Sequence, residues 1–170
     1  MTAAIDSLKK GLAGFESSQP TEDQRRNLSM TCSSLAACYL ELGDADTALG
    51  YFRRQNIKTE ELQGDARITA LSFEVKYYHL TGDHGRRDAA IDDMLSTVES
   101  TPSLLGVFDE LFLLCNFLYK VGHLDQLWRL LCSIEVLNTQ TDITVMQLKF
   151  MTYKAYYYKE KGLREEYLAA

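Results

Sequence analysis

Four glycines stand at nearly constant intervals along this chain of 170 residues, and each ends a run of residues with helical periodicity. They are Gly43, Gly82, Gly122 and Gly162, separated by 39, 40 and 40 residues. Glycine readily adopts the left-handed conformation that ends many helices. A constant spacing of this length is typical of a repeated helical unit. The chain is therefore expected to fold as successive helix–turn–helix units.

The residues before each glycine also repeat. Eleven residues before it stand Cys32, Leu71, Leu111 and Met151. Seven before it stand the smaller Ala36, Val75, Cys115 and Ala155, and four before it stand Tyr39, Tyr78, Leu118 and Tyr158. Spacings of four, three and four place these side chains on one stripe of a helix. The small residue in the middle lets a second helix approach closely.

Helical periodicity extends over nearly the whole chain, and no stretch alternates as a half-buried strand would. Proline occurs only twice, at Pro20 and Pro102. Helices are expected to begin at Thr21, where Gln24 completes a capping box, and at Thr101, which precedes a proline. Thr141 is a third predicted helix cap. The predicted fold class is all-α.

Composition excludes several classes of protein. The net charge of −6 and the absence of a basic block argue against a nucleic-acid binder. The first ten residues contain no apolar core of a secretory signal. The most apolar stretch, 103–119, is interrupted by Asp109 and Glu110, so it predicts a buried helix rather than a membrane span. A soluble, cytoplasmic domain is expected.

Cysteine and histidine spacing predicts no metal site. The four cysteines (Cys32, Cys38, Cys115 and Cys132) form no C-x-x-C pair, and the three histidines are not spaced as zinc ligands. Each cysteine lies within an apolar helical pattern. They are interpreted as small hydrophobic residues kept reduced in the cytoplasm, and no cofactor is predicted.

The repeated columns resemble the tetratricopeptide repeat, W-x2-L-G-x2-Y…A-x3-F. The first unit matches at Leu35, Ala36, Tyr39, Gly43, Ala48 and Phe52, with Cys32 where tryptophan is usual. The third has Leu114, Cys115, Leu118, Gly122, Leu127 and Leu131. In the second, Arg87 falls where alanine belongs. Ala90 and Met94 restore the pattern three residues later, which predicts a longer turn.

This resemblance implies a right-handed α-solenoid of antiparallel helix pairs with a period of about 40. The period exceeds the usual 34 residues and the closing proline is absent, and HEAT and armadillo repeats do have periods near 40. The Gly-Asp turns favour tetratricopeptide-like units. The expected division is a leading or capping helix in 1–19, helix-pair units at 21–56, 59–99 and 101–138, and an incomplete fourth unit at 141–170.

No catalytic residues are predicted, because the sequence has none of the common nucleophile, metalloprotease or phosphate-loop motifs. His84, His123 and Asp125 lie at expected turns, where such residues are usually solvated. Neighbouring acids on a helix point in different directions and make no catalytic dyad. The chain is therefore expected to be non-catalytic and to bind a partner, with a structural spacer as the alternative.

The last part of the chain suggests a context. Residues 124–170 resemble helical regions that precede catalytic domains in some bacterial diguanylate cyclases. The resemblance implies a regulatory or sensory domain of a longer, multidomain bacterial signalling protein, with a catalytic domain downstream. A co-chaperone-like or assembly scaffold that binds a peptide in its groove is the alternative. A homodimer through an exposed terminal repeat is a further expectation.

By resemblance to tetratricopeptide domains, partners bind on the concave face formed by the first helix of each pair. The residues expected on that face are Lys76, His79, Phe112, Asn116, Tyr119, Lys120, Lys149, Tyr156 and Lys159. Four lysines gather there in an acidic protein, although Asp109 and Glu160 reduce the bias. The expected ligand is a peptide or protein partner, or a small anionic molecule. Scattered, solvated lysines are the alternative interpretation.

Overall fold

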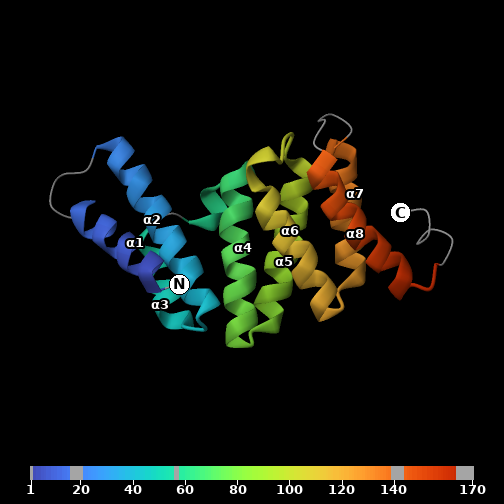
Figure 1. Cartoon of the computed structure of the whole chain (residues 1–170), viewed down its shortest axis with the longest axis horizontal. Coiled ribbons are helices and arrows are strands. Elements are labelled where there is room, and N and C mark those ends of the chain that lie inside the picture. Colours follow the sequence, from blue (N-terminus) through green and yellow to red (C-terminus); the bar gives the residue numbers. More distant parts are fainter. Residues whose placement is uncertain (1, 16–20, 56–57, 139–143, 164–170) are drawn as a thin grey trace. The chain divides into compact units, whose positions relative to one another are not determined.

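The computed structural model describes residues 2–15, 21–55, 58–138 and 144–163, and the described residues are all helical (Figure 1). They form eight α-helices and two short 3-10 helices, with no strand in these ranges. The elements are α1 (Thr2–Phe15), α2 (Glu22–Glu41), α3 (Ala45–Arg54), η1 (Thr59–Glu61), α4 (Gly64–Thr81), α5 (His84–Ser100), η2 (Leu105–Val107), α6 (Phe108–Val121), α7 (Leu124–Asn138) and α8 (Thr144–Glu160). The predicted all-α class is confirmed.

The chain divides into two compact units. The first comprises Met1–Glu61 and Phe73–Asp88, and it contains α1, α2 and α3. In this unit, α1 packs on α2 through Ile5 and Leu12, which share a buried cluster with residues of α2. Ala48 of α3 packs with Ala36 of α2, and both side chains are fully buried. The helix α2 is therefore covered by one helix on each of two sides.

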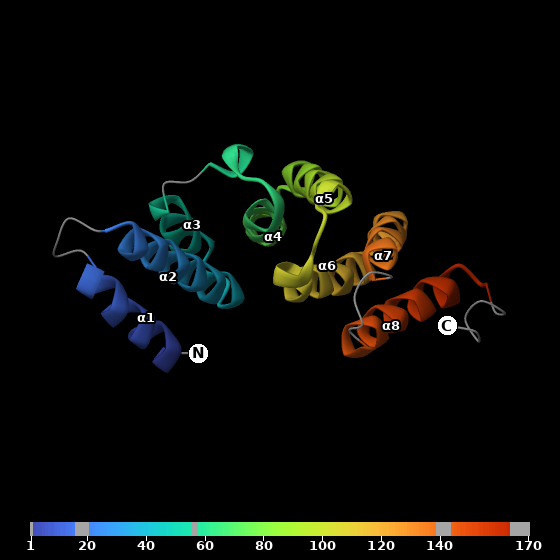
Figure 2. The same ribbon diagram turned by 90° about the horizontal axis from the view of Figure 1, so that it is seen from above.

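The second unit comprises Leu62–Ser72 and Ala89–Ala170, and α6, α7 and α8 all contact one another in it (Figure 2). The middle of α6 is fully buried at Leu111, Cys115 and Leu118. Burying a leucine or similar side chain stabilises a fold by about 1.5–3 kcal/mol. The α6 helix is therefore the centre of this unit, and its apolar stripe provides the core.

The four repeated glycines all adopt the left-handed conformation, with φ between 72° and 79°. At the first, the Gly43 amide donates to the Leu40 carbonyl at 3.0 Å, and the Asp44 amide donates to the Tyr39 carbonyl at 2.9 Å. The same two bonds, three and five residues back, recur at each of the other glycines. They satisfy carbonyls that the end of a helix leaves without partners. The predicted role of the glycines as helix stops is confirmed.

The turns after Gly43, Gly82 and Gly122 have the same length, so the prediction of a longer second turn is wrong. The carbonyl of Asp83 accepts the amide of Arg87 at 3.0 Å, as the carbonyl of Asp44 accepts that of Ala48. Arg87 therefore occupies the position of the repeat's alanine. Its side chain is almost fully buried and pairs with Asp88 at 2.7 Å, which compensates for burying a charge there.

The sequence predicted that helices begin at Thr21 and at Thr101, and only the first prediction is confirmed. The capping box is confirmed, because Thr21 Oγ1 accepts from the Gln24 amide at 3.3 Å and the Gln24 side chain accepts from the Thr21 amide at 2.8 Å. No helix begins at Thr101, because its hydroxyl donates back to the Thr97 carbonyl at 2.7 Å and closes α5. The next α-helix begins only at Phe108. Thr141 and the segment 164–170 lie outside the described residues.

The columns eleven and seven residues before the glycines are buried in α2, α4 and α6 and partly exposed in α8. Cys32, Leu71 and Leu111 are at most 2% exposed, but the equivalent Met151 is 42% exposed. Ala155 is only half-buried, whereas Ala36 at the same repeat position is fully buried. Within the described residues, α8 is therefore less covered at these positions than α2, α4 and α6, the helices that precede the first three glycines.

Replacing Gly122 with alanine should lower the free energy of unfolding by about 1–2 kcal/mol, because an L-residue is strained at its φ of 78°. No heavy atom lies within 4 Å of a Cβ added there, so backbone strain is the only expected cost. Gly50→Ala, in the interior of α3 with equally open space, is the matched control and should stabilise by about 0.5–1 kcal/mol. Urea denaturation followed by circular dichroism measures both.

Ala36→Leu should destabilise by about 1–3 kcal/mol, because the larger side chain overpacks the closed contact with α3. Ala155→Leu, the same change at the same repeat position, should change stability by less than about 0.5 kcal/mol because its site is partly open. Equal costs in the two variants would contradict the difference in cover between α2 and α8.

Candidate binding face on α6 and α8

The helices α6 and α8 lie side by side and parallel, as the first helices of successive hairpins should. The aromatic pairs between them run in the same order along both helices, so the two helices point the same way. The ring centroids of the contacting aromatic pairs are separated by 6.0 Å in Phe108–Phe150, 5.5 Å in Phe112–Tyr153 and 5.0 Å in Tyr119–Tyr156. These aromatic contacts set the distance between the two helices, and with it the spacing of the side chains that both expose.

Seven of the nine residues predicted to bind a partner lie on these two helices. They are Phe112, Asn116, Tyr119 and Lys120 on α6, and Lys149, Tyr156 and Lys159 on α8. All are exposed or half-exposed. The other two, Lys76 and His79, lie on α4 in the first compact unit, so they form no common site with the seven in either unit.

We define the α6/α8 face as these seven residues, and two contacts between the helices hold its side chains. The Lys149 ammonium lies 4.9 Å from the centroid of the Phe112 ring, a cation–π contact. Tyr119 stacks on Tyr156 at 5.0 Å, and its hydroxyl donates to Glu160 at a long 3.5 Å. The face therefore presents ordered aromatic surface with charged groups held beside it.

The lysines of α8 differ in the charges that surround them. On the side toward α7, Lys154 pairs with Glu135 at 2.6 Å and Lys161 lies 3.1 Å from a carboxylate oxygen of Asp125. On the α6/α8 face, Lys149 and Lys159 have no such ion pair within the described part of the chain, and the same is true of Lys120. Among the described residues of this unit, the basic side chains without an ion pair are therefore Lys120 on α6 and Lys149 and Lys159 on α8.

Two acids moderate this charge. Asp109 is exposed near the start of α6, and Glu160 lies beside Tyr119 near the end of α8. Three lysines and two carboxylates leave a small positive excess on a protein whose net charge is −6. The effect is local, because charges separated by more than about 8–10 Å are largely screened at physiological salt.

Buried side chains of α6 and α8 pack beneath the α6/α8 face. Tyr153 packs edge-on against Phe112, with 5.5 Å between the ring centroids, and is 7% exposed. Burial raises the pKa of the Tyr153 hydroxyl, and the neighbouring Cys115 adds to the shift. Cys115 is fully buried, and burial raises the pKa of its thiol far above the ordinary value. These groups stay neutral at physiological pH, so they serve packing rather than chemistry.

Leu113 was missed by the sequence-based selection. It lies on α6 one turn from Asp109 and from Asn116, and it is 44% exposed. The selection followed repeat columns, and the equivalent residues Phe73 and Tyr153 are buried in their helices. The signal that was available is that Leu113 stands four residues after Asp109 and three before Asn116, on the polar side of α6.

Two of the residues considered for catalysis, His84 and Asp125, lie in the first turn of a helix. His84 Nδ1 lies 3.1 Å from the Arg87 guanidinium in the first compact unit, and Asp125 accepts from Lys161 in the second. Across the described ranges, no three His, Cys, Asp or Glu side chains lie close enough to hold a metal ion. No described helix is long and apolar enough to cross a membrane.

Comparison with known proteins gives no relative: no family model, no curated protein and no solved structure matches this chain. The interpretation of the α6/α8 face therefore rests on its own geometry and charge.

Cys115 should react slowly with a thiol reagent such as Ellman's reagent in the native state, since it is buried and its pKa is raised. The half-buried Cys38 provides an internal comparison and should react faster. Labelling followed by peptide mass spectrometry separates the two sites. Equal rates at native pH would show that α8 does not cover Cys115.

Proposed function

We propose that this chain is a non-catalytic, tetratricopeptide-like binding module whose α6/α8 face binds an acidic peptide segment of a protein partner. The observation that carries the proposal is the distribution of lysines on α8. Lys154 and Lys161, toward α7, are neutralised by carboxylates, whereas Lys149, against Phe112 of α6, and the exposed Lys159 have no ion pair within the described residues. Lysines without an ion pair beside exposed aromatic rings offer a ligand both positive charge and apolar contact area, and charge of one sign attracts a ligand of the opposite sign.

The partner's chemistry follows from the groups that the face offers. Lys120 and Lys159 supply ammonium donors, and Asn116 supplies an amide. Leu113 and the Tyr119–Tyr156 stack offer apolar contact area between them. A segment with carboxylates and an interspersed apolar residue satisfies both kinds of group. The mode of binding proposed is a peptide lying along two parallel helices, within a right-handed α-solenoid.

The biological role proposed is regulatory. A binding module of this kind suits a sensory part of a multidomain bacterial signalling protein, as the resemblance of residues 124–170 to regions preceding diguanylate cyclase domains implies. On this proposal, partner binding changes the activity or association of another domain. A scaffold role uses the same face but requires no change in activity on binding.

The binding proposal is tested with two fluorescein-labelled octapeptides, one alternating Glu with Leu and the other alternating Gln with Leu. The wild-type chain should bind the Glu peptide more tightly in fluorescence anisotropy, and the preference should shrink as salt is raised. Reversing both charges in Lys120→Glu, Lys159→Glu should weaken binding about tenfold, since each exposed pair contributes up to about 1 kcal/mol.

The matched control is Lys10→Glu, Lys58→Glu, which changes the net charge equally on exposed residues outside the face. It should leave the affinity for the Glu peptide within about twofold of wild type. An equal loss of affinity in both double variants would mean that net charge alone, and not the α6/α8 face, determines binding. Equal affinity of the wild-type chain for the Glu and the Gln peptide would rule out an acidic partner.

A further inference from the structure

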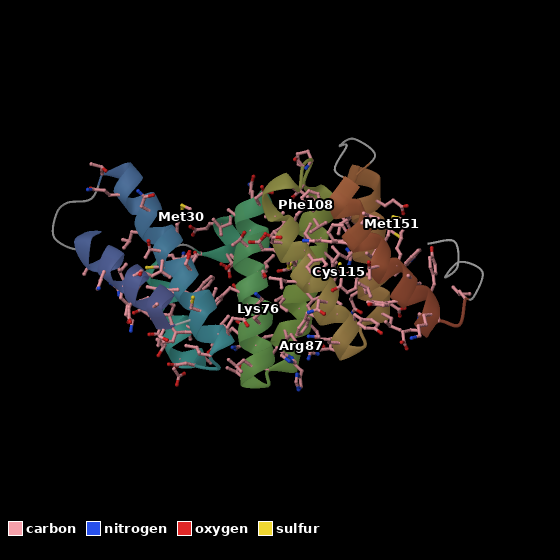
Figure 3. The ribbon with its side chains drawn as sticks, viewed as in Figure 1. Met30, Lys76, Arg87, Phe108, Cys115 and Met151 are labelled. Carbon is pink, nitrogen blue, oxygen red and sulfur yellow. The ribbon has the colours of Figure 1, made fainter. Side chains whose placement is uncertain are left out.

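A tyrosine hydroxyl and a carboxylate meet across the α6/α8 face. Tyr119 lies one turn after Cys115 on α6 (Figure 3), and its hydroxyl donates to a carboxylate oxygen of Glu160, the last residue of α8. The two oxygen atoms are 3.5 Å apart, whereas a hydroxyl bonded to a carboxylate normally lies within about 2.5–2.7 Å of it. The two groups are therefore in contact, but the hydrogen bond between them is weak.

The position of the Tyr119 hydroxyl is set by ring packing and does not depend on this bond. The Tyr119 ring stacks on Tyr156, with 5.0 Å between the ring centroids and an interplanar angle of 21°. Tyr156 in turn packs edge-on against Tyr153, with 5.9 Å between the centroids, and Tyr153 is buried. A hydroxyl anchored through its ring in this way keeps its place when Glu160 moves away.

Glu160 is held less firmly than the carboxylates that contact α8 from α7. Glu135 lies 2.6 Å from the Lys154 ammonium, and Asp125 lies 3.1 Å from that of Lys161. Glu160 is exposed and has no ion pair within the described ranges. Because its side chain already meets water, turning it away from Tyr119 costs little beyond one weak hydrogen bond.

The groups next to Glu160 are those expected to bind an acidic peptide. Lys120 follows Tyr119 on α6, Lys159 precedes Glu160 on α8, and both lysines are exposed. A peptide carboxylate beside these lysines can accept a hydrogen bond from the Tyr119 hydroxyl. Two carboxylates at one donor repel each other, so only one of them is accommodated. The peptide carboxylate and the Glu160 carboxylate are therefore alternative acceptors for the same hydroxyl.

We propose that Glu160 competes with the acidic partner for the Tyr119 hydroxyl, so that a carboxylate of the peptide displaces it on binding. The inference rests on the proposed function of the α6/α8 face and adds the roles of these two residues. Tyr119 is a specificity-determining donor that recognises the peptide carboxylate, and Glu160 limits the affinity. The chain thus binds its partner less tightly than the tyrosine and the lysines alone would allow.

Fluorescence anisotropy of the labelled Glu–Leu octapeptide with variants of the full chain tests this competition. Glu160→Ala should bind the peptide about fivefold more tightly than wild type, because the competing acceptor and its charge are both removed. Glu41→Ala is the matched control, since Glu41 is also exposed and also stands two residues before a repeated glycine. Glu41 lies on α2, outside the α6/α8 face, so this variant should bind within about twofold of wild type.

A double-mutant cycle separates competition for the hydroxyl from the effect of charge. Tyr119→Phe keeps the ring that stacks on Tyr156 but removes the hydroxyl, and it should weaken binding of the Glu–Leu peptide about threefold. In the Tyr119→Phe background there is no hydroxyl to compete for. Glu160→Ala should then improve binding by at most about twofold, the part that comes from the change in charge.

Three outcomes would contradict the inference, and they are distinguishable. An equal gain from Glu160→Ala in both backgrounds would show that Glu160 acts through its charge alone. Unchanged affinity of Glu160→Ala, with a wild-type chain that still prefers the Glu peptide to the Gln peptide, would overturn the competition and leave the proposed function standing. A wild-type chain that binds the two peptides equally would overturn both. Unchanged helical circular dichroism of each variant verifies that it is folded.

Discussion

The left-handed glycine turn is the constraint on which the rest of this structure depends. Each of the four repeated glycines places its own amide and the next one on carbonyls three and five residues back, so the helix ends at a fixed point. A hairpin turn with this geometry returns the chain antiparallel after only a few residues. Because the turns recur every 39 or 40 residues, residues at equal distances from each glycine occupy equivalent positions.

Much of the fold was predictable from the sequence because its signals are local. A capping box, a glycine at a helix end and a stripe with spacings of four and three depend on neighbouring residues only, and they identified the helices around Thr21, Gly43 and Gly122. Predictions failed where a polar side chain could interact with either of two nearby groups. Thr101 was expected to begin a helix, but its hydroxyl bonds back to Thr97. Arg87 was expected to displace the pattern, but an adjacent carboxylate lets it remain in place.

The candidate site was likewise predictable only as far as local sequence patterns determine it. Counting back from the glycines identified seven exposed or half-exposed residues of α6 and α8, because both helices repeat the same register. It did not identify which lysines keep their charge uncompensated, since that depends on Glu135 and Asp125 of α7. Nor did it identify Leu113, whose equivalents in other helices are buried. Exposure and charge pairing are set by neighbours distant in sequence.

The sides of α8 differ in the charges that surround them. Lys154 and Lys161 pair with carboxylates of α7, whereas Lys149 lies against the Phe112 ring of α6. The contacts that α8 makes with α6 and α7 therefore decide which of its lysines are left without an ion pair. Binding that depends on these lysines should weaken in high salt.

The most direct test of the central claim, that the α6/α8 face is the binding surface, is a nuclear magnetic resonance titration of the isotope-labelled chain with the Glu–Leu octapeptide. Amide shifts should change most at Leu113, Asn116, Tyr119, Tyr156 and Lys159, and little on α1 and α3. Shifts confined to other helices, or spread evenly over all exposed lysines, would contradict it.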